Sequence, residues 1–337
     1  MTGRRAMIRA AHVLALALLV GACGPQPAAA PLEKVSVLLD WTHQAQFAGM
    51  YVADQKGWYA EEGLQVMLLP RSEPTADLLA PLAEGAAQFG IVEAVLPIRA
   101  RAAGKPIVAL AAVYQRNPSV FITLADSGIT RPQDFAGHTM RALQPGAGGD
   151  MAFRGMMARL GLDAGSVKQV KTGFDLAPFL TRQVDIWPGF IFDQVLTLRQ
   201  QGHQVNLIIP DDYGVHFYGD LIATTGRLIE ERPDLVLRFL RATLRGWRWA
   251  VENPADAGPL ALKYDPSLDA AQQAAAMEAS VPLIHTGVDP IGWMAPDVWQ
   301  QTQAMLLAQG LLAQPVDLDA VFTMRFLEQV YGKGEKE

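Results

Sequence analysis

Short apolar runs alternate with segments of helical periodicity through most of this chain. The runs at 35–39, 66–69 and 89–92 are rich in Val, Leu and Ile. The segment at 45–56, and another that ends at Ala103, carry apolar residues at helical spacing. Strands that alternate with helices form βαβ units, in which the strands run parallel. The alternation therefore predicts an α/β fold.

Further segments of both kinds continue the pattern. Strands are expected at 107–113, 120–124, 138–141, 167–170, 184–187 and 205–209. Helices are expected at 74–84, 151–160, 176–181, 192–200, 270–277, 296–307 and 319–330, with the chain turning helical from Leu228. The chain is too large for one small core, so we expect two lobes, each a mainly parallel sheet flanked by helices. Lobe one takes 33–118 and 222–337, and lobe two takes 119–221.

The first residues have the pattern of an export signal. Arginines precede a short apolar run at 10–20, which is about half the length that a spanning helix needs. This pattern predicts a signal peptide at 1–22. Cys23, the only cysteine, follows small residues as in a bacterial lipobox, and 23–32 reads as a tether. We expect a lipid on Cys23 that anchors the exported chain, facing periplasm or cell exterior. The alternative is an ordinary signal peptide with a chance cysteine.

Composition argues against two classes of partner. The net charge is −6, and no cluster of Lys or Arg forms the basic stripe that nucleic-acid binding needs. The six histidines show no metal-ligand spacing, and one cysteine cannot build a thiolate site. We therefore expect no nucleic acid, no metal and no cofactor.

Candidate ligand-binding residues follow the strands, because ligands in open α/β sheets bind beyond the carboxyl ends of the strands and between lobes. Aromatic candidates, which offer flat faces to a heteroaromatic ring, are Trp41, Phe47, Trp187, Phe190, Tyr213, Phe217 and Tyr218. Polar candidates, which would bond a ring amine, are Gln46, Glu93, Gln115, Asp193 and Asp220. The alternatives are that the aromatic residues pack the seam between lobes, that Asp220 caps a turn and that Glu93 caps a helix.

The glycine-rich loop at 146–149 precedes a helix. Backbone N–H groups at a helix start bind anions, so a sulfonate or nitrate would fit there. A plain loop is the alternative, since the loop has neither a Walker lysine nor a Rossmann spacing.

Several motifs resemble one family of solute-binding proteins. The relevant stretches are Leu-Asp-Trp at 39–41, Gln-Phe-Ala-Gly-Met-Tyr-Val-Ala at 46–53, Lys-Gly-Trp-Tyr-Ala-Glu-Glu-Gly-Leu at 56–64, and later ones at 185–189, 213–220 and 233–242. Together they resemble the proteins grouped with thiamine-pyrimidine synthase and with the sulfonate- and nitrate-binding proteins such as SsuA.

The resemblance implies a two-lobed periplasmic-binding-protein fold of type II that closes on a small molecule in the interlobe cleft. Its partners would be an ABC permease and ATPase, with the protein a monomer that catalyses nothing. The ligand would be a thiamine pyrimidine precursor or similar heteroaromatic, a sulfonate, nitrate or taurine-like anion, or a flavin. The subset that carries pyrimidine precursors usually has a histidine where this chain has Phe47. The Arg238, Arg241, Arg245 and Arg248 face is either solvated or a permease contact.

Two other functions stay open. The family includes a synthase that uses a lysine bearing pyridoxal phosphate and a sacrificed histidine, and these positions match Val92 and Leu96 here. Without an amine at Val92 no Schiff base forms, so the resemblance disfavours the enzyme. A sensory subunit that reports to a membrane receptor would have the same sequence features as a transport subunit.

Overall fold

The computed structural model describes residues 31–71, 77 and 79–332. The predicted signal peptide, Cys23 and the expected start of a helix at Pro74 lie outside the described residues. Contacts divide the chain into a unit at Met1–Leu32 and a second at Glu33–Glu337, and the fold below is that of the second.

A five-stranded sheet forms first, in the order β2-β1-β3-β10-β4. Its strands are β1 (Glu33–Leu38), β2 (Leu64–Leu69), β3 (Phe89–Glu93), β4 (Ile107–Ala112) and β10 (Asp220–Thr225). Strands β2 and β3 run parallel to β1, whereas β10 runs antiparallel to both β3 and β4. Every residue of β4 and β10 is buried, which is why these stretches read as continuous apolar or Thr-rich runs.

Two smaller sheets follow. Strands β8 (Trp187–Phe190), β5 (Ser119–Leu124) and β9 (Val205–Ile208) pair antiparallel, with β5 in the middle. Strands β6 (Thr139–Arg141) and β7 (Lys168–Val170) pair parallel. The α/β fold is therefore confirmed, but the sheets are mixed and not mainly parallel. Apolar runs report burial and not direction, so the sequence could not distinguish the two pairings.

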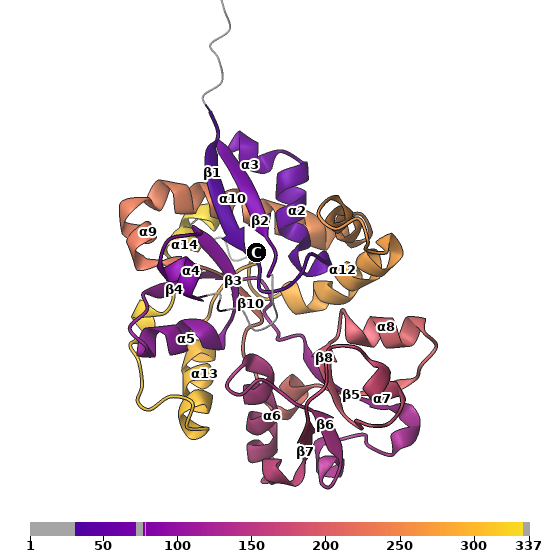
Figure 1. The fold of residues 1–337 in the computed structure, drawn as a ribbon. Coiled ribbons are helices and arrows are strands. Elements are labelled where there is room, and N and C mark those ends of the chain that lie inside the picture. The colour runs from indigo at the N-terminus through magenta and orange to yellow at the C-terminus, as the bar shows by residue number, and fades with distance from the viewer. Residues whose placement is uncertain (1–30, 72–76, 78, 333–337) are drawn as a thin grey trace, which may run out of the picture. The chain divides into compact units, whose positions relative to one another are not determined.

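Helices surround these sheets (Figure 1). They are α2 (Ala48–Gln55), α3 (Trp58–Glu61), α4 (Leu79–Ala83), α5 (Val95–Ala102), α6 (Gly148–Arg159), α7 (Ala177–Leu180), α8 (Gln194–Gln200), α9 (Gly226–Glu231), α10 (Pro233–Glu252), α11 (Pro254–Ala257), α12 (Ala270–Ile284), α13 (Pro296–Ala308) and α14 (Arg325–Tyr331).

Helices α2 and α10 pack with their backbones nearly in contact. A Cβ added at Gly246 would lie 2.0 Å from the Gly49 carbonyl oxygen, and one at Gly49 would lie 2.2 Å from the Trp247 ring. Both positions need glycine for this close approach. The pairing fixes α2, and with it the loop that follows β1, against the long helix.

Several predicted elements are wrong in their limits, and the helix expected at 270–277 continues to Ile284 as α12. The strand expected at 184–187 begins instead at Trp187 and continues through Pro188 and Gly189 to Phe190. Proline is tolerated there because β8 is an edge strand. The helix expected at 319–330 is a short 3-10 turn at Leu318–Ala320 followed by α14.

Two segments cross between the sheets. Residues 113–118 link β4 to β5, and residues 209–219 link β9 to β10. They are bonded to each other: Gly219 N donates to Tyr114 O at 2.9 Å, and Arg116 Nε lies 2.6 Å from Asp211 Oδ2. Strand β10 begins at Asp220, inside the segment predicted as lobe two, and the exact division into lobes stays a prediction.

Candidate functional site

Three carboxylates meet where β1 and β3 end and β10 begins. Asp220 opens β10 and pairs in register with Glu93, the last residue of the antiparallel neighbour β3. Asp40 follows β1, which runs parallel to β3 on its other side. The topology thus brings Asp40, Glu93 and Asp220 together at one end of the inner strands of the sheet. We call these three acids and Gln46 the carboxylate cluster.

Gln46 links two of these acids. Its Nε2 donates to Asp220 Oδ2 at 2.8 Å and to Asp40 Oδ1 at 3.2 Å, while its Oε1 accepts from Gln44 Nε2 at 2.8 Å. Gln46 is 2% exposed and Asp220 is 8% exposed. The 3-10 turn Ala45–Phe47 that carries Gln46 is anchored from α12, where Gln273 Oε1 accepts from Ala45 N at 2.6 Å. Gln46 is therefore held in place as the one amide between two acids.

Burial raises the pKa of every acid in the cluster, and the charges of neighbouring acids raise the pKa of Asp40 and Asp220 further. Burial, followed by the charges of Asp220 and Glu93, raises the pKa of Asp40 well above its usual range. Burial raises the pKa of Asp220 to about 7, against the Gln46 hydrogen bond, and Glu93 adds to the rise. Burial also raises the pKa of Glu93, opposed by its bond from Gly148 N and by Arg71 and Arg99. Such a cluster favours a ligand that brings hydrogen-bond donors or positive charge.

Glu93 makes a second contact across the fold. Its Oε2 accepts from Gly148 N, the first residue of α6, at 2.8 Å. Helix α6 has no N-cap side-chain bond from Ala147, so the carboxylate of a distant strand supplies one. The alternative in which Glu93 caps the helix after its own strand is wrong, because the N-cap of α5 is Ala94 without a side-chain bond.

The remaining polar candidates are engaged elsewhere. Gln115 Nε2 donates to the backbone oxygens of Ala112 and Trp293 at 2.7 and 2.9 Å. Asp193 accepts from Gln194 Nε2 at 2.6 Å, and burial raises its pKa. These hydrogen bonds do not involve the carboxylate cluster, and the ligand role of both residues stays a prediction.

Trp41 and Trp187 are connected through the Phe174 ring and the Arg141 guanidinium. The Trp41 ring meets Phe174 edge-on at 5.4 Å between centroids. The Arg141 guanidinium lies 4.3 Å from the Phe174 centroid and 5.2 Å from that of Trp187. Trp41 is partly exposed, whereas Trp187 is 2% exposed within the smaller hydrophobic core. The Trp41 indole is therefore open to water in part, whereas the Trp187 indole is a core side chain.

The other aromatic candidates divide between core and surface. Phe47, Phe217 and Tyr218 are buried in the main core, and Tyr218 Oη accepts from Ala295 N at 2.7 Å. Phe217 lies beside Gly148, since a Cβ added there would be 3.6 Å from its ring. Phe190 is half-buried against Phe192.

Tyr213 lies in a different electrostatic environment. Burial, and then the charge of Asp212, raises its pKa, with Arg131 and Asp134 acting more weakly. No member of the carboxylate cluster acts on it.

Sequence reasoning missed Asp40 and Phe174. Asp40 stands inside the Leu-Asp-Trp motif, where Trp41 drew attention instead. Its position two residues beyond the last residue of β1 was the available signal. Phe174 lies in an irregular segment between β7 and α7 and is 54% exposed, and its sequence context carries no signal.

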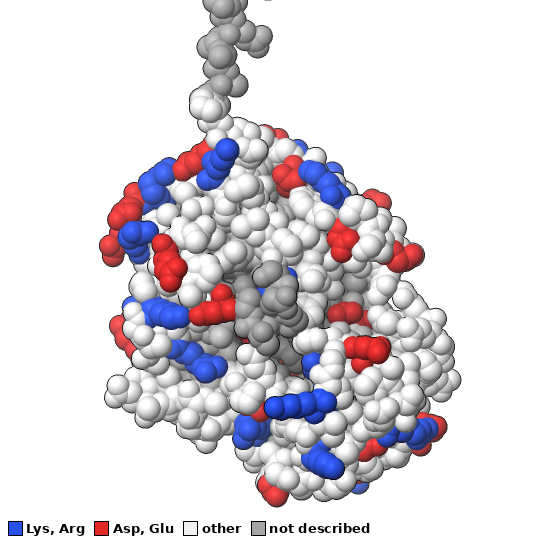
Figure 2. Space-filling model, in the orientation of Figure 1, with Lys and Arg blue, Asp and Glu red and all other residues white. Residues whose placement is uncertain are grey.

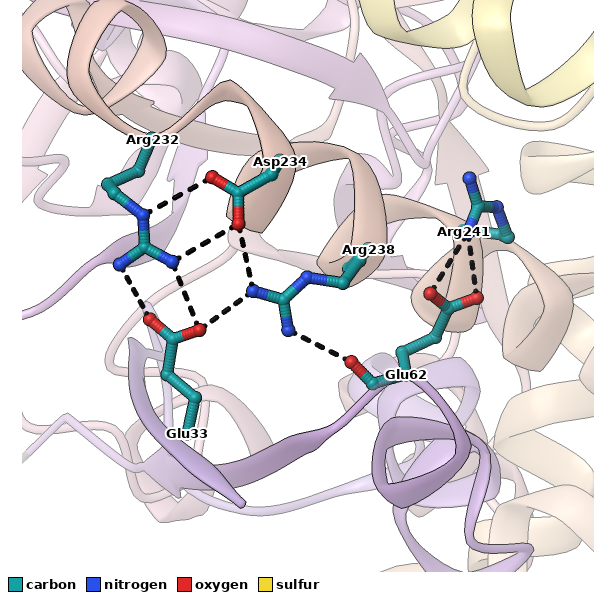
Figure 3. Close-up of polar contacts among 6 residues, drawn as sticks. All are labelled: Glu33, Glu62, Arg232, Asp234, Arg238 and Arg241. Carbon is teal, nitrogen blue, oxygen red and sulfur yellow. Dashed lines mark hydrogen bonds and ion pairs between the residues drawn. The ribbon is translucent and has the colours of Figure 1, made fainter. Parts of the chain in front are cut away.

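The arginine face of α10 pairs with acids of its own protein (Figure 3). Arg232 and Arg238 share Glu33 and Asp234, with Nη–Oε distances to Glu33 of 2.8 and 2.7 Å. Arg241 lies 2.9 Å from Glu62. We call these six residues the arginine network.

Beyond the network, Arg245 pairs with Glu61 and Arg248 lies over the Tyr331 ring. Figure 2 shows Lys and Arg interspersed with Asp and Glu over the visible face. The arginines of α10 therefore attach α3 and β1 to this helix and do not form an unpaired positive face.

No group of three or more His, Cys, Asp or Glu side chains arranged to hold a metal ion occurs in the part of the chain that the structure describes. Within the same residues, no helix is long and apolar enough to cross a membrane.

Comparison with known proteins extends this picture. The riboflavin-binding protein RibY of Chloroflexus aurantiacus is 29% identical over 315 residues, covering 90% of this chain and 89% of RibY. The formylaminopyrimidine-binding protein of Halalkalibacterium halodurans is 29% identical over 300 residues, covering 87% and 90%. A 4-amino-5-hydroxymethyl-2-methylpyrimidine phosphate synthase of Legionella pneumophila is 28% identical over 240 residues, covering 70% and 75%.

Among solved structures, the periplasmic aliphatic sulphonate binding protein SsuA from Escherichia coli matches with a TM-score of 0.68 at 19% identity, covering 86% of this chain and 91% of SsuA. The predicted periplasmic-binding-protein fold is thereby confirmed. The family model described as NMT1/THI5 like matches residues 44–257, which is more than half of the sequence. The chain belongs to the NMT1/THI5-like family.

Proposed function

We propose that this protein is the solute-binding subunit of an ABC importer and that it captures a small heteroaromatic molecule rich in N–H donors. The observation that carries the proposal is the carboxylate cluster. Asp40 and Asp220 each accept a hydrogen bond from Gln46 Nε2, in surroundings that make an unpaired charge costly. A ring amine or imide N–H would replace that internal bond with donors of its own.

The named ligands of two relatives fit this chemistry. Riboflavin carries one imide N–H on the edge of its flat ring system, and a formylaminopyrimidine carries amino and formamide N–H groups, so each heterocycle presents at least one donor. A stacking surface and an acceptor edge would bind either. In this proposal Trp41 supplies the surface, and Asp40, Gln46 and Asp220 supply the edge.

The crossing segments 113–118 and 209–219 would serve as the hinge. Their backbone bonds and the Arg116–Asp211 pair keep them together, so rotation about them would move β5, β8 and β9 as one body. The closed form would then deliver its ligand to a permease and ATPase.

The anchor belongs to the same proposal. Export with a lipid on Cys23 would hold a monomeric binding protein at the membrane surface beside its permease. Cys23→Ala should then abolish incorporation of a fatty-acid analogue. Label that persists on this variant would contradict the anchor and leave the binding function untouched.

A synthase activity is not proposed, despite the synthase relative. The position matched to the cofactor lysine is Val92, which is fully buried within β3, and Leu96 stands at the matched histidine position. Neither side chain has a nitrogen with which to form a Schiff base. A sensory subunit would use the same site, and neighbouring permease and ATPase genes would favour transport over it.

Mass spectrometry of small molecules released from gently purified protein tests the proposal. We expect a heteroaromatic compound with ring N–H or amino groups, in near-stoichiometric amount. Release of an alkanesulfonate instead would contradict it. If nothing co-purifies, calorimetry with riboflavin and with formylaminopyrimidine decides, and absence of binding by both would count against the proposed ligand class.

A further inference from the structure

Glu93 occupies a place where an anion would bind. Helix α6 runs for 12 residues from Gly148, and the loop before it is glycine-rich. Its first N–H group points to Glu93 Oε2 at 2.8 Å, and a Cβ added at Gly148 would lie only 3.0 Å from that oxygen. The helix start expected to hold a sulfonate or nitrate therefore already holds a carboxylate of the protein.

A second acid, Asp150, accepts a hydrogen bond from the neighbouring backbone N–H of Gly146. Asp150 Oδ2 accepts from Gly146 N at 2.9 Å, and its Oδ1 pairs with Arg154 Nε at 2.9 Å. Asp150 is almost fully buried. Arg99, on α5, donates to the Gly146 carbonyl oxygen and so is directed to the backbone.

The other acids of the cluster, Asp40 and Asp220, also disfavour an anion at the start of α6. Asp40 and Asp220 lie close enough to Glu93 for its charge to raise both of their pKa values. An anion that reached this helix start would displace one carboxylate and face two more. A donor-bearing ligand meets no such repulsion.

We propose that Glu93 is the specificity-determining residue by which this protein rejects anionic solutes. Its carboxylate accepts the hydrogen bond from Gly148 N, at the start of α6, that an anion would otherwise accept. The proposal rests on the proposed function, because it explains why a protein with the fold of a sulfonate-binding protein would select a donor-rich heterocycle instead.

Calorimetric titration with propanesulfonate and with nitrate, on wild type, Glu93→Ala and Glu93→Gln, tests it. Glu93→Ala frees Gly148 N and removes a charge, so its apparent Kd for propanesulfonate should fall at least about tenfold, the equivalent of one good hydrogen bond to an ion. Glu93→Gln keeps an oxygen that accepts from Gly148 N and should gain much less. Glu84→Ala, at an exposed glutamate, should behave as wild type.

Two results would overturn the proposal: no gain in Glu93→Ala, or an equal gain in Glu93→Gln, which would leave charge alone as the barrier. If Glu93→Ala melts below the titration temperature, Glu93→Thr takes its place, since a β-branched residue suits a strand and cannot reach Gly148. Riboflavin and formylaminopyrimidine are titrated in parallel. A gain for propanesulfonate without binding of either heterocycle would contradict the proposed ligand and leave the role of Glu93 standing.

Discussion

The carboxylate cluster and the arginine network both contain Asp and Glu side chains, but their surroundings shift the pKa of Asp220 and of Asp234 in opposite directions. In the network, hydrogen bonds from Arg232, together with those from Arg238, lower the pKa of Asp234 to about 2. In the cluster, burial raises the pKa of Asp220 to about 7, and the nearest partner is the neutral amide of Gln46. In the network each acid pairs with arginine, whereas within the described residues Asp40 and Asp220 share the neutral side-chain amide of Gln46.

The difference indicates which region is less stable than it could be because it serves function. A network of partly exposed charges, each paired with an opposite charge, attaches α10 to β1 and to the end of α3. A buried group of acids with one shared amide costs stability, and such groups concentrate where a ligand completes them. Four predictions compare the two regions directly.

The largest effect should be on stability as a function of pH. The folded-state pKa of Asp220 lies above its ordinary value of 3.8, so the folded protein binds this proton more tightly than the unfolded chain. Its contribution is therefore most favourable below about pH 4 and is lost as pH rises through about 7, a difference of several kcal/mol. Asp220→Asn should remove this loss, so the variant should melt higher than wild type at pH 8.

Asp234→Asn is the matched control with the opposite sign. The pKa of Asp234 is depressed, so its contribution is present above about pH 4 and is lost as pH falls toward 2. Because Asp234 is largely exposed, the loss at pH 7 should be less than about 1 kcal/mol. Melting curves in which both variants show the same pH dependence would contradict the contrast.

Ligand binding should separate the regions next. Asp220→Asn removes one carboxylate acceptor and should weaken binding of the co-purifying heterocycle, measured at pH 8, about 30- to 150-fold, or 2–3 kcal/mol. Asp234→Asn should leave affinity unchanged. Calorimetry measures both, and a loss of similar size in the two variants would show that the Asp220 effect is not local.

Gln46→Met sharpens the comparison within the cluster. Methionine matches the volume of glutamine and cannot donate to Asp40 or Asp220, so two buried acids lose a partner. We expect a loss of about 1–2 kcal/mol in the free energy of unfolding, measured by urea denaturation at pH 7. Unchanged stability would mean that water replaces the amide without cost.

The smallest effect belongs to the network. Arg241→Ala breaks a pair with Glu62 in which the arginine side chain is 49% exposed. The loss should be below about 1 kcal/mol and should shrink further in salt, because exposed ion pairs are weak and screened. A larger loss, insensitive to salt, would show that the network is not the set of partly exposed pairs described above.

Much of this arrangement could be predicted from the sequence. The alternation of apolar runs and helical segments predicted the α/β class and most strands, and the motif at 39–53 predicted the fold family. The rule that ligand contacts follow strands predicted Gln46, Glu93 and Asp220 as candidates, and the structure brings these three together.

The rest depended on pairing that no local pattern encodes. Pro188 and Gly189 read as strand breakers, so the true extent of β8 was missed. The Glu93–Gly148 bond joins residues 55 positions apart, and the pairing of the α10 arginines with Glu33 and Glu62 spans still more of the chain. Only the folded backbone shows that Asp40 faces Asp220.

A crystal structure of the protein with its co-purified ligand tests the central claim most directly. We predict that ring N–H or amino groups lie about 3 Å from the carboxylates of Asp40 and Asp220, with a ring face against Trp41. A ligand held elsewhere, with Gln46 still bonded to both acids, would contradict the account.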